Sequence, residues 1–434
     1  MIRDLDEALE TLPFGRLRVL VLLLVTSIIV LDGFDIQLAA LAAPAMLAEW
    51  GLDRVAFGPV LAASLAGMAA GTALGGSIGD RIGRRPALIG AVLFFATMTA
   101  LSALATGPVT LGLLRLATGL GLGAAVPNAT ALVAEWMPRR WRSYAVMLVI
   151  VAVPVGGMLG AALCAWMIPA FGWRACFILG GVAPVLLALI MIITLPESPQ
   201  FLVTRDDRSN HLRHLVNRLA GDNRFDNVTI FRTSAPTPGK GGVAELLSVP
   251  LRAITWHLWA GFFAAMLALY GCLNWLPVLL SGLGLPMDQA VRGSMWFNLG
   301  GVAGALLGAW AGGRFGSARC LSALCLTGAF ILSIAAIALA LGHIPGVTAA
   351  MVPVLLAGGA ILGVQVGLYG LAAARYPTSC RAAGIGWAAT LGRGGAVVSA
   401  LAGGWILAQP LGAALWLGVL TLALLYCWRA VRTL

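Results

Sequence analysis

Four charged side chains stand inside long apolar stretches of this sequence: Asp32, Asp35, Arg115 and Arg393. An ionised side chain at the centre of a membrane costs about 3 kcal/mol on insertion scales, so it is retained where it faces a polar cavity or a counter-charge. Carboxyl groups in such a place can bind and release protons. A guanidinium group can hold a carboxylate by two parallel hydrogen bonds. The residue types therefore predict proton exchange and anion binding.

The two aspartates lie in the run Leu31-Asp32-Gly33-Phe34-Asp35, three residues apart, so in a helix they share one face. Two acids at one site titrate as a pair, and the sequence does not assign the exchanged proton to either. The alternative is a short interfacial helix that ends near Leu31, with both aspartates in a loop.

Arg115 is the expected partner of the aspartates, and Thr118 and Gly119 follow it on the same helix face. Small residues let membrane helices approach closely. Protonation of an aspartate would then release Arg115 electrostatically and couple proton binding to a rearrangement. The alternative is an arginine that extends to the membrane interface.

Arg393 has no acid within the apolar segments of its half of the chain, so we expect it to bind the carboxylate of a substrate, with Arg115 as a second candidate for substrate binding. The alternative is an arginine bonded to backbone carbonyls or water in a packing role. Other candidate substrate contacts are aromatic and amide side chains, several at helical spacing: Tyr270 and Asn274, Gln365 and Tyr369, with Trp296, Asn298 and Trp387. Each could equally pack or anchor at an interface.

The elements that hold these residues are membrane spans. The chain has 434 residues, of which 60% are hydrophobic and 10% charged, and its mean hydropathy is +0.94. A soluble chain would carry about a quarter charged residues, and apolar stretches of about twenty residues can each cross a bilayer. The composition predicts an all-α polytopic membrane protein.

Twelve spans are expected in two groups of six. A cytoplasmic N-terminal segment (1–16) precedes a first six-helix bundle (17–195), and a polar linker (196–251) with a short amphipathic helix or two leads to a second bundle (252–434). The expected spans are 17–43, 57–78, 87–106, 109–134, 143–167, 174–194, 252–281, 290–312, 320–341, 347–374, 382–404 and 410–428.

The distribution of positive charge explains the net charge of +11. Of the 28 lysine and arginine residues, 23 fall on one side of the expected spans, and Arg54, Arg174 and Arg292 fall on the other. This asymmetry places both termini in the cytoplasm and makes a nucleic-acid partner unnecessary. The first sixteen residues lack the basic start of a signal peptide, so the first apolar segment is expected to remain as a span.

The two halves carry traces of an internal repeat. At an offset of 239, Gly119 corresponds to Gly358, and at an offset of 233 the stretch 80–83 corresponds to 313–316. Repeated halves are typical of transporters whose bundles rock around a central site.

Several motifs resemble those of the major facilitator superfamily, and within it those of the aromatic acid:proton symporters. The first is the stretch 76–85, Gly-Ser-Ile-Gly-Asp-Arg-Ile-Gly-Arg-Arg, in the loop between the second and third spans. The other matching stretches are Arg115 with Gly119, Gly121 and Gly123, Pro196-Glu197-Ser198-Pro199, Asp32-Gly33-Phe34-Asp35, Pro127-Asn128 through Glu135 and Pro138, Asn274-Trp275-Leu276-Pro277, and Arg381 through Gly394.

The resemblance implies a proton symporter in the bacterial inner membrane that imports carboxylates such as hydroxybenzoates, protocatechuate, vanillate and gallate. It also implies a gate at the cytoplasmic ends of the spans, formed by Asp80, Arg81, Arg84, Arg85 and Glu135. A solvated charge run that only sets the topology is the alternative for these arginines. The chain departs from the family pattern at Gly313, where the repeat of Asp80 lacks its charge, and near Pro154 and Ser399.

Competing functions are transport of another organic acid, drug antiport, and a transporter-like chemoreceptor. An intramembrane enzyme is disfavoured, because no span carries a nucleophile with a base or a metal-ligand cluster. No phosphate-binding loop for ATP is present. We expect no cofactor and no metal, protons as the coupling ion, the lipid bilayer as the surroundings, and a monomer.

Overall fold

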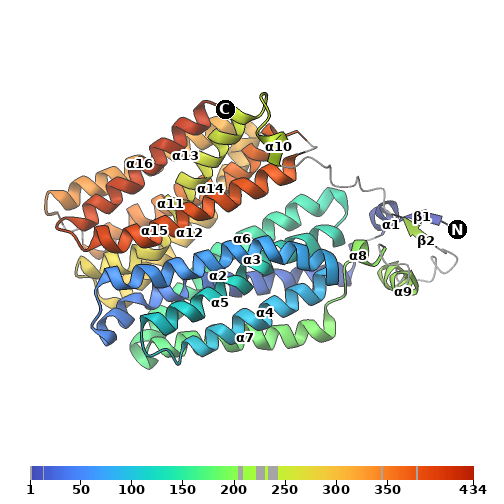
Figure 1. Ribbon diagram of the computed structural model, residues 1–434, viewed down its shortest axis with the longest axis horizontal. Coiled ribbons are helices and arrows are strands. Elements are labelled where there is room, and N and C mark those ends of the chain that lie inside the picture. Colours follow the sequence, from blue (N-terminus) through green and yellow to red (C-terminus); the bar gives the residue numbers. More distant parts are fainter. Residues whose placement is uncertain are drawn as a thin grey trace.

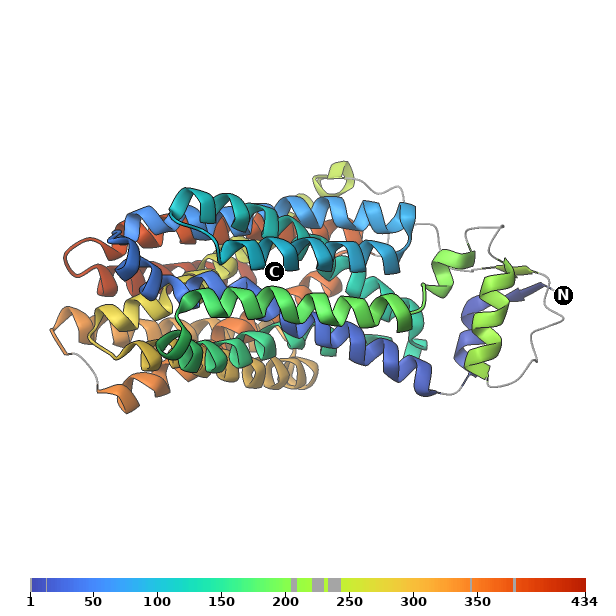
Figure 2. The ribbon, with the colours of Figure 1, turned by 90° about the horizontal axis from the view of Figure 1, so that it is seen from below.

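The computed structural model describes residues 2–12, 14–203, 209–220, 230–232, 243–343, 346–377 and 380–434. Ten of its helices are long and apolar enough to cross a membrane, and α12 and α15 add two more of 29 and 27 residues. The prediction of an all-α membrane protein is confirmed. In the described part of the chain, twelve long helices run roughly along one axis (Figures 1 and 2).

Each half of the chain contributes six of the long helices. The first six are α2 (Arg16–Trp50), α3 (Arg54–Ile82), α4 (Arg84–Ser102), α5 (Pro108–Trp136), α6 (Arg139–Phe171) and α7 (Trp173–Thr194). The second six are α11 (Arg252–Gly282), α12 (Met287–Phe315), α13 (Ser317–Ala340), α14 (Val347–Arg375), α15 (Arg381–Leu407) and α16 (Gly412–Arg432). The 196–251 segment lies between the two sets. We call the end of the bundles at which the chain begins and ends the linker end, and the other the far end.

Glycines bring equivalent helices together in both halves. A Cβ atom on Gly119 of α5 would lie 2.1 Å from the backbone oxygen of Ser64 on α3. A Cβ on Gly358 of α14 would lie 1.9 Å from the backbone oxygen of Phe297 on α12. Gly119 corresponds to Gly358 at the offset of 239, and Ser64 corresponds to Phe297 at the offset of 233. The same close helix contact is therefore built twice, as an internal repeat requires.

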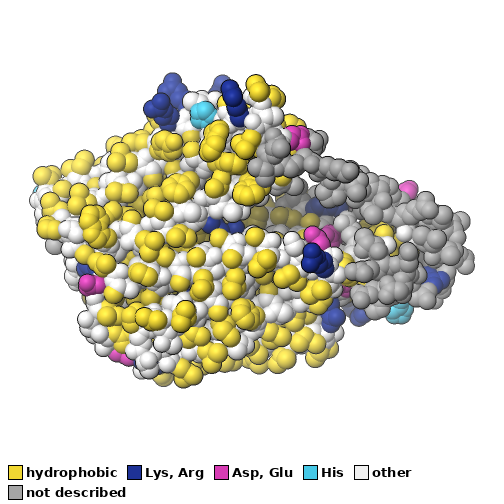
Figure 3. All heavy atoms as spheres, in the orientation of Figure 1, with side chains coloured by type: hydrophobic (Ala, Val, Ile, Leu, Met, Phe, Trp, Pro, Cys, Tyr) yellow, Lys and Arg dark blue, Asp and Glu magenta, His cyan; other side chains and the backbone are white. Residues whose placement is uncertain are grey.

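The bundles meet mainly through α6 against α12 and α3 against α15, with α2 against α11. At the far end, Arg54 of α3 donates a hydrogen bond to the backbone oxygen of Leu407 on α15. Toward the middle of α2 and α12, Gln37 and Asn298 exchange two hydrogen bonds. Figure 3 shows a hollow between the two halves that widens toward the linker end. The structure is thus closed at the far end.

A small lobe lies beyond the linker end (Figure 2). It contains β1 (Ile2–Asp4), α1 (Leu5–Thr11), α8 (Pro199–Val203), α9 (Ser209–Ala220) and β2 (Ile230–Arg232), and α10 (Val243–Leu246) follows beside the second bundle. Strands β1 and β2 pair in parallel, which the sequence did not predict. Fully buried Arg18 donates hydrogen bonds to the backbone oxygens of Leu9 and Leu12, which fixes α1 to the start of α2.

Candidate functional site

Asp32 and Asp35 lie within the continuous helix α2, so the alternative that places them in a loop is wrong. Their exposed fractions are 0% and 1%. The helix continues for four turns beyond Asp35, because the following residues are small and apolar up to Pro44 and the helix ends at Gly51 in the left-handed conformation. Both carboxyl groups therefore stand deep in the protein, as the apolar sequence around them indicates.

Asp35 is surrounded by polar side chains inside the first bundle. Its Oδ1 is 2.7 Å from Nη1 of Arg115, and the hydroxyl of Thr99 donates to its Oδ2. Nη2 of the same arginine donates to the hydroxyl groups of Thr99, Ser102 and Thr118, at 3.0, 3.1 and 2.9 Å. Arg115 is 1% exposed, so it does not extend to the membrane interface. This pair has the geometry of a buried, hydrogen-bonded ion pair.

Sequence reasoning missed Thr99 and Ser102 of α4. The signal that could have found them is their spacing of three residues in an apolar helix, which puts two hydroxyl groups on one face.

Asp32 has a different environment, because neither of its carboxyl oxygens has a hydrogen-bond partner among the described residues. The charge that acts on it from the second bundle is Arg393 of α15. Arg393 is half-buried and makes no ion pair or hydrogen bond with the residues that the structure describes. Asp32 of the first bundle and Arg393 of the second are therefore close enough to interact electrostatically, and neither has a direct partner among the described residues.

Polar and aromatic side chains of the second bundle surround this place. Tyr270 of α11 and Tyr369 of α14 are half-buried and lie within the electrostatic range of Arg393. One helical turn away on the same helices, Asn274 and Gln365 are buried. The Asn274 Nδ2 and both amide atoms of Gln365 lack hydrogen-bond partners in the described chain. Because buried polar atoms are normally bonded, they indicate a site for water or a ligand.

Two residues near this place were not predicted. Ser294 of α12 is 1% exposed, and its hydroxyl oxygen also lacks a partner among the described residues. Gln37 of α2 bonds to Asn298, with Nε2 to Oδ1 at 3.1 Å and Nδ2 to Oε1 at 2.8 Å. A glutamine five residues after Asp32 in an apolar run was the available signal for Gln37.

The structure keeps Trp387 apart from the group around Arg393. It stands nearly two turns closer to the linker end on α15, is 43% exposed, and its ring centroid is 6.5 Å from that of Trp259. Thr390 bonds to the backbone oxygen of Gly386 in its own helix, and Trp296 is half-buried. The side chain of Arg381 lies outside the described residues.

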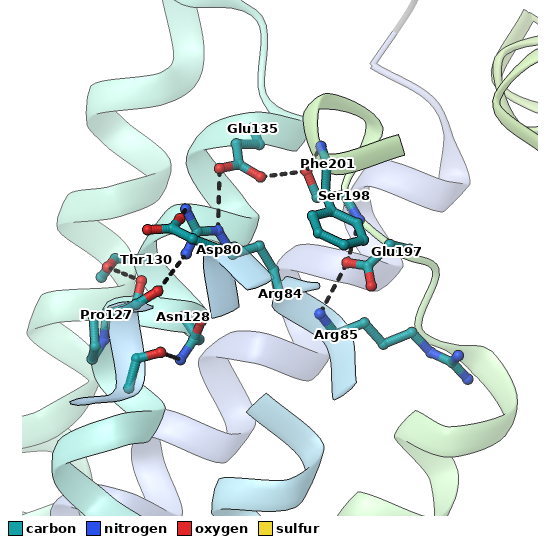
Figure 4. A network of polar contacts seen from close by, with 12 residues as sticks. Asp80, Arg84, Arg85, Pro127, Asn128, Thr130, Glu135, Glu197, Ser198 and Phe201 are labelled. Carbon is teal, nitrogen blue, oxygen red and sulfur yellow. Dashed lines mark hydrogen bonds and ion pairs between the residues drawn. The ribbon is translucent and has the colours of Figure 1, made fainter. Parts of the chain in front are cut away.

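A second polar network lies at the linker end of the first bundle (Figure 4). Arg84 of α4 is 2.5 Å from a carboxyl oxygen of Asp80 on α3 and 3.4 Å from one of Glu135 on α5. Glu135 accepts a hydrogen bond from the hydroxyl of Ser198. Arg81 is exposed. The predicted gating residues Asp80, Arg84 and Glu135 are therefore brought together, on three helices of one bundle.

Glu197 extends this network, and sequence reasoning gave it no role. Its Oε1 accepts from the backbone nitrogens of Arg85 and Ser198, at 3.0 and 2.8 Å. Gly83 has φ of +113°, and a Cβ atom there would lie 2.2 Å from a carboxyl oxygen of Glu197. The turn between α3 and α4 thus needs glycine both for its backbone conformation and for this contact.

Two repeated six-helix bundles around a buried charged site define a secondary transporter. The family model described as Major Facilitator Superfamily matches residues 25–400. The chain belongs to the major facilitator superfamily, whose members are transporters rather than enzymes, as its motifs indicated.

Curated relatives cover nearly the whole chain. A gallate transporter of Pseudomonas putida is 35% identical over 411 residues, which are 94% of this chain and 90% of the relative. The 4-hydroxybenzoate transporter PcaK of the same species is 36% identical over 93% of this chain and 89% of its own.

Solved structures share the fold at lower identity. A bacterial homologue of the human lysosomal transporter Spinster, inward-facing, has a TM-score of 0.73 at 18% identity, over 97% of this chain and 98% of that one. The xylose transporter XylE of Escherichia coli has a TM-score of 0.72 at 17% identity, over 96% and 98%.

Proposed function

We propose that this protein imports aromatic carboxylates, of the hydroxybenzoate, protocatechuate, vanillate or gallate type, by proton symport. The observation that carries the proposal is the electrostatic interaction between Asp32 of the first bundle and Arg393 of the second, each of which lacks a direct partner in the described chain. Relatives named for gallate and 4-hydroxybenzoate transport support the substrate class. We place the protein in the bacterial inner membrane as a monomer, with the linker end in the cytoplasm because that end carries the positive charge.

Arg393 is the residue we assign to the substrate carboxylate. A guanidinium group that has no protein carboxylate within bonding distance can donate two parallel hydrogen bonds to the carboxylate of a substrate. Tyr270 and Tyr369 offer ring faces and hydroxyl groups beside it, and Asn274 and Gln365 offer unbonded amide groups for ring hydroxyls. Trp387, nearer the linker end, would contact the substrate on its way out. A benzoate ring with polar substituents matches this set of groups.

Proton coupling follows from competition for Arg393. When Asp32 is ionised, it draws the guanidinium toward the first bundle; when Asp32 is protonated, the substrate carboxylate takes its place. Substrate and proton would then load together, which is the requirement for symport. The pair of Asp35 and Arg115 stays within the first bundle and holds the α2 segment that presents Asp32.

The Asp80, Arg81, Arg84, Arg85 and Glu135 group is proposed as the gate at the linker end. In the present state, closed at the far end, Arg84 holds together α3, α4 and α5 of one bundle. Closing the linker end would bring the second bundle against this network.

Uptake of radiolabelled 4-hydroxybenzoate and protocatechuate into proteoliposomes, with and without an inward proton gradient, tests the proposal. We expect accumulation above equilibrium only with the gradient, and none in the Asp32→Asn protein. Binding without accumulation would indicate a sensor. Accumulation that needs no proton gradient would remove the symport mechanism.

A further inference from the structure

Arg54 connects the two bundles at the far end. It is the first residue of α3, and its Nη1 donates to the backbone oxygen of Leu407, the last residue of α15, at 2.9 Å. No carboxylate of the described chain forms an ion pair with Arg54. Its neighbour Asp53 instead accepts a hydrogen bond from the backbone nitrogen of Ala56 and caps α3.

The position of this arginine is unusual for the helix that carries it. A cation at a helix N-terminus is disfavoured by the helix dipole, while the last carbonyl groups of a helix lack donors. Arg54 therefore gains little within α3 and satisfies the C-terminus of α15 in the other bundle. The hydrogen bond therefore stabilises the contact between the two bundles rather than the helix that carries Arg54.

Glycines on two helices of the second bundle make room for Arg54. A Cβ atom on Gly282, at the end of α11, would lie 2.4 Å from its Nη2. A Cβ on Gly404 of α15 would lie 2.6 Å from its backbone oxygen. Three helices thus meet at Arg54 only because two of them lack side chains there.

A cavity of about 550 Å³ opens beside this contact. Its wall includes Pro44 and Leu47 of α2 and Val278 and Ser281 of α11, so it lies between the bundles as Arg54 does. A side chain in this cavity can report whether the far end is open.

We propose that Arg54 is the latch of the far end, a positioning residue that holds the bundles together there and releases Leu407 each time the far end opens. A charged donor on a neutral carbonyl stabilises the closed state more than an ordinary hydrogen bond does. Because the acceptor has no charge, the contact can still be broken in every transport cycle. The inference rests on alternating access and is independent of which acid is carried.

Labelling of Ser281→Cys in cells by a membrane-impermeant maleimide tests the latch. Six of the seven native cysteines are buried, and the protein without the added cysteine gives the background rate. With Arg54→Ala we expect the labelling rate of Cys at position 281 to rise about tenfold, since a hydrogen bond from a charged group is lost. With Arg54→Lys, which can still reach a carbonyl, we expect a smaller rise.

Arg292→Ala is the matched control, because Arg292 is at the same end and, among the described residues, its one ion pair is with Asp288 one turn earlier on α12. We expect no change in labelling for this variant. Equal labelling rates in Arg54→Ala and Arg292→Ala would overturn the proposal, whatever the transport activity of either protein.

Gly282→Ala gives an independent test with Arg54 still present. The added methyl group would displace the guanidinium, so labelling should rise as in Arg54→Ala, while the maximal transport rate falls and KM changes less. Gly261→Ala in the same helix is the control, because its Cβ would find its nearest neighbour at 3.7 Å. If Gly282→Ala labels no faster than Gly261→Ala, Arg54 does not hold the far end closed.

Discussion

Asp32 and Asp35 are one turn apart on α2 and both are buried, yet Asp35 is bonded to Arg115 and Thr99 while Asp32 has no hydrogen-bond partner in the described chain. The bonds to Arg115 and Thr99 fix the Asp35 carboxyl group within the first bundle. A buried carboxyl group without such bonds can bind a proton, or release it and interact with a nearby cation, without first breaking a hydrogen bond. The two acids of the motif therefore have separable roles, and Asp32 is the one we expect to carry the coupled proton.

Neutralising each aspartate should separate these roles. Asp32→Asn should abolish accumulation against a gradient but retain exchange of labelled for unlabelled substrate, because the fold does not depend on a bond to Asp32. Asp35→Asn should lower the stability by about 3–5 kcal/mol, because it leaves Arg115 buried without its partner. Exchange assays and thermal unfolding of the purified proteins measure the two effects.

Asp288→Asn is the control, since Asp288 is half-buried near the far end and its pair with Arg292 is 3.8 Å long. It should leave both measurements unchanged. If Asp32→Asn lowers the stability and Asp35→Asn does not, Asp32 is the structural residue and Asp35 the residue that carries the coupled proton.

Arg115→Lys should fail despite conserving the charge. Arg115 contacts Asp35 and three hydroxyl groups through two guanidinium nitrogens, a geometry that a single ammonium group does not reproduce. We expect a loss of about 2 kcal/mol or more of stability and a large fall in transport rate. Arg292→Lys, at an exposed arginine whose pair with Asp288 is 3.8 Å long, is the matched control and should be close to neutral. Similar melting temperatures for both variants would contradict this account.

The sequence predicted the long helices well, because apolar length and charged ends decide where a membrane helix begins and stops. It also predicted that Arg115 would face the aspartates. It did not indicate which of the two aspartates Arg115 would contact, because a spacing of three residues places both on one helix face. Helix α4 makes the difference, since its Thr99 lies beside Asp35 and bonds to it.

Arg393→Lys should raise KM for 4-hydroxybenzoate about tenfold or more with a smaller change in maximal rate. The flat guanidinium group can bond to both oxygens of a carboxylate at once, whereas an ammonium group acts as a point charge and does not reproduce this geometry. Initial uptake rates over a range of concentrations separate the two parameters. Arg292→Lys serves as the control for a charge outside the site. An unchanged KM in Arg393→Lys would move the carboxylate site elsewhere.

Uptake should increase as the external pH falls at constant internal pH. A proton is a co-substrate in symport, so more of the outward-facing carrier has Asp32 protonated at lower external pH, and accumulation grows with the gradient. Exchange by the Asp32→Asn protein should be nearly flat with pH, because the group that binds the proton is gone. A pH profile of Asp32→Asn exchange that keeps the slope of the unmodified protein would assign the proton to another residue.

The electrostatic interaction between Asp32 and Arg393 could not be predicted from the sequence for a physical reason. The apolar segments of its own half offer Arg393 no acid, and the sequence alone does not specify how two six-helix bundles are placed against each other. The parallel pairing of β1 with β2 was missed for the same reason, since three-residue strands far apart in the chain leave no periodic signal. Residues that share a helix face can be predicted from their spacing, whereas contacts between distant segments can be predicted only where, as for Arg115 and the aspartates, opposite charges lie in apolar spans of the same bundle.

Gly33→Ala should disable the transporter although it adds a single methyl group. A Cβ atom at Gly33 would lie 2.1 Å from the backbone oxygen of Val153 on α6, and one at Gly156 would lie 1.9 Å from that of Val30 on α2. The two helices therefore touch through backbone on both sides of Asp32. Overpacking of this kind costs about 1–3 kcal/mol, and here it must also shift the segment that presents both aspartates.

Gly90→Ala in α4 is the matched control, because a Cβ there meets nothing within 4 Å and alanine is a better helix former by about 1 kcal/mol. We expect Gly90→Ala to keep or raise the melting temperature, and Gly33→Ala to lower both the melting temperature and the uptake rate. If Gly33→Ala transports normally, α2 and α6 can separate without loss of function. The glycine between the two aspartates would then have no role in positioning them.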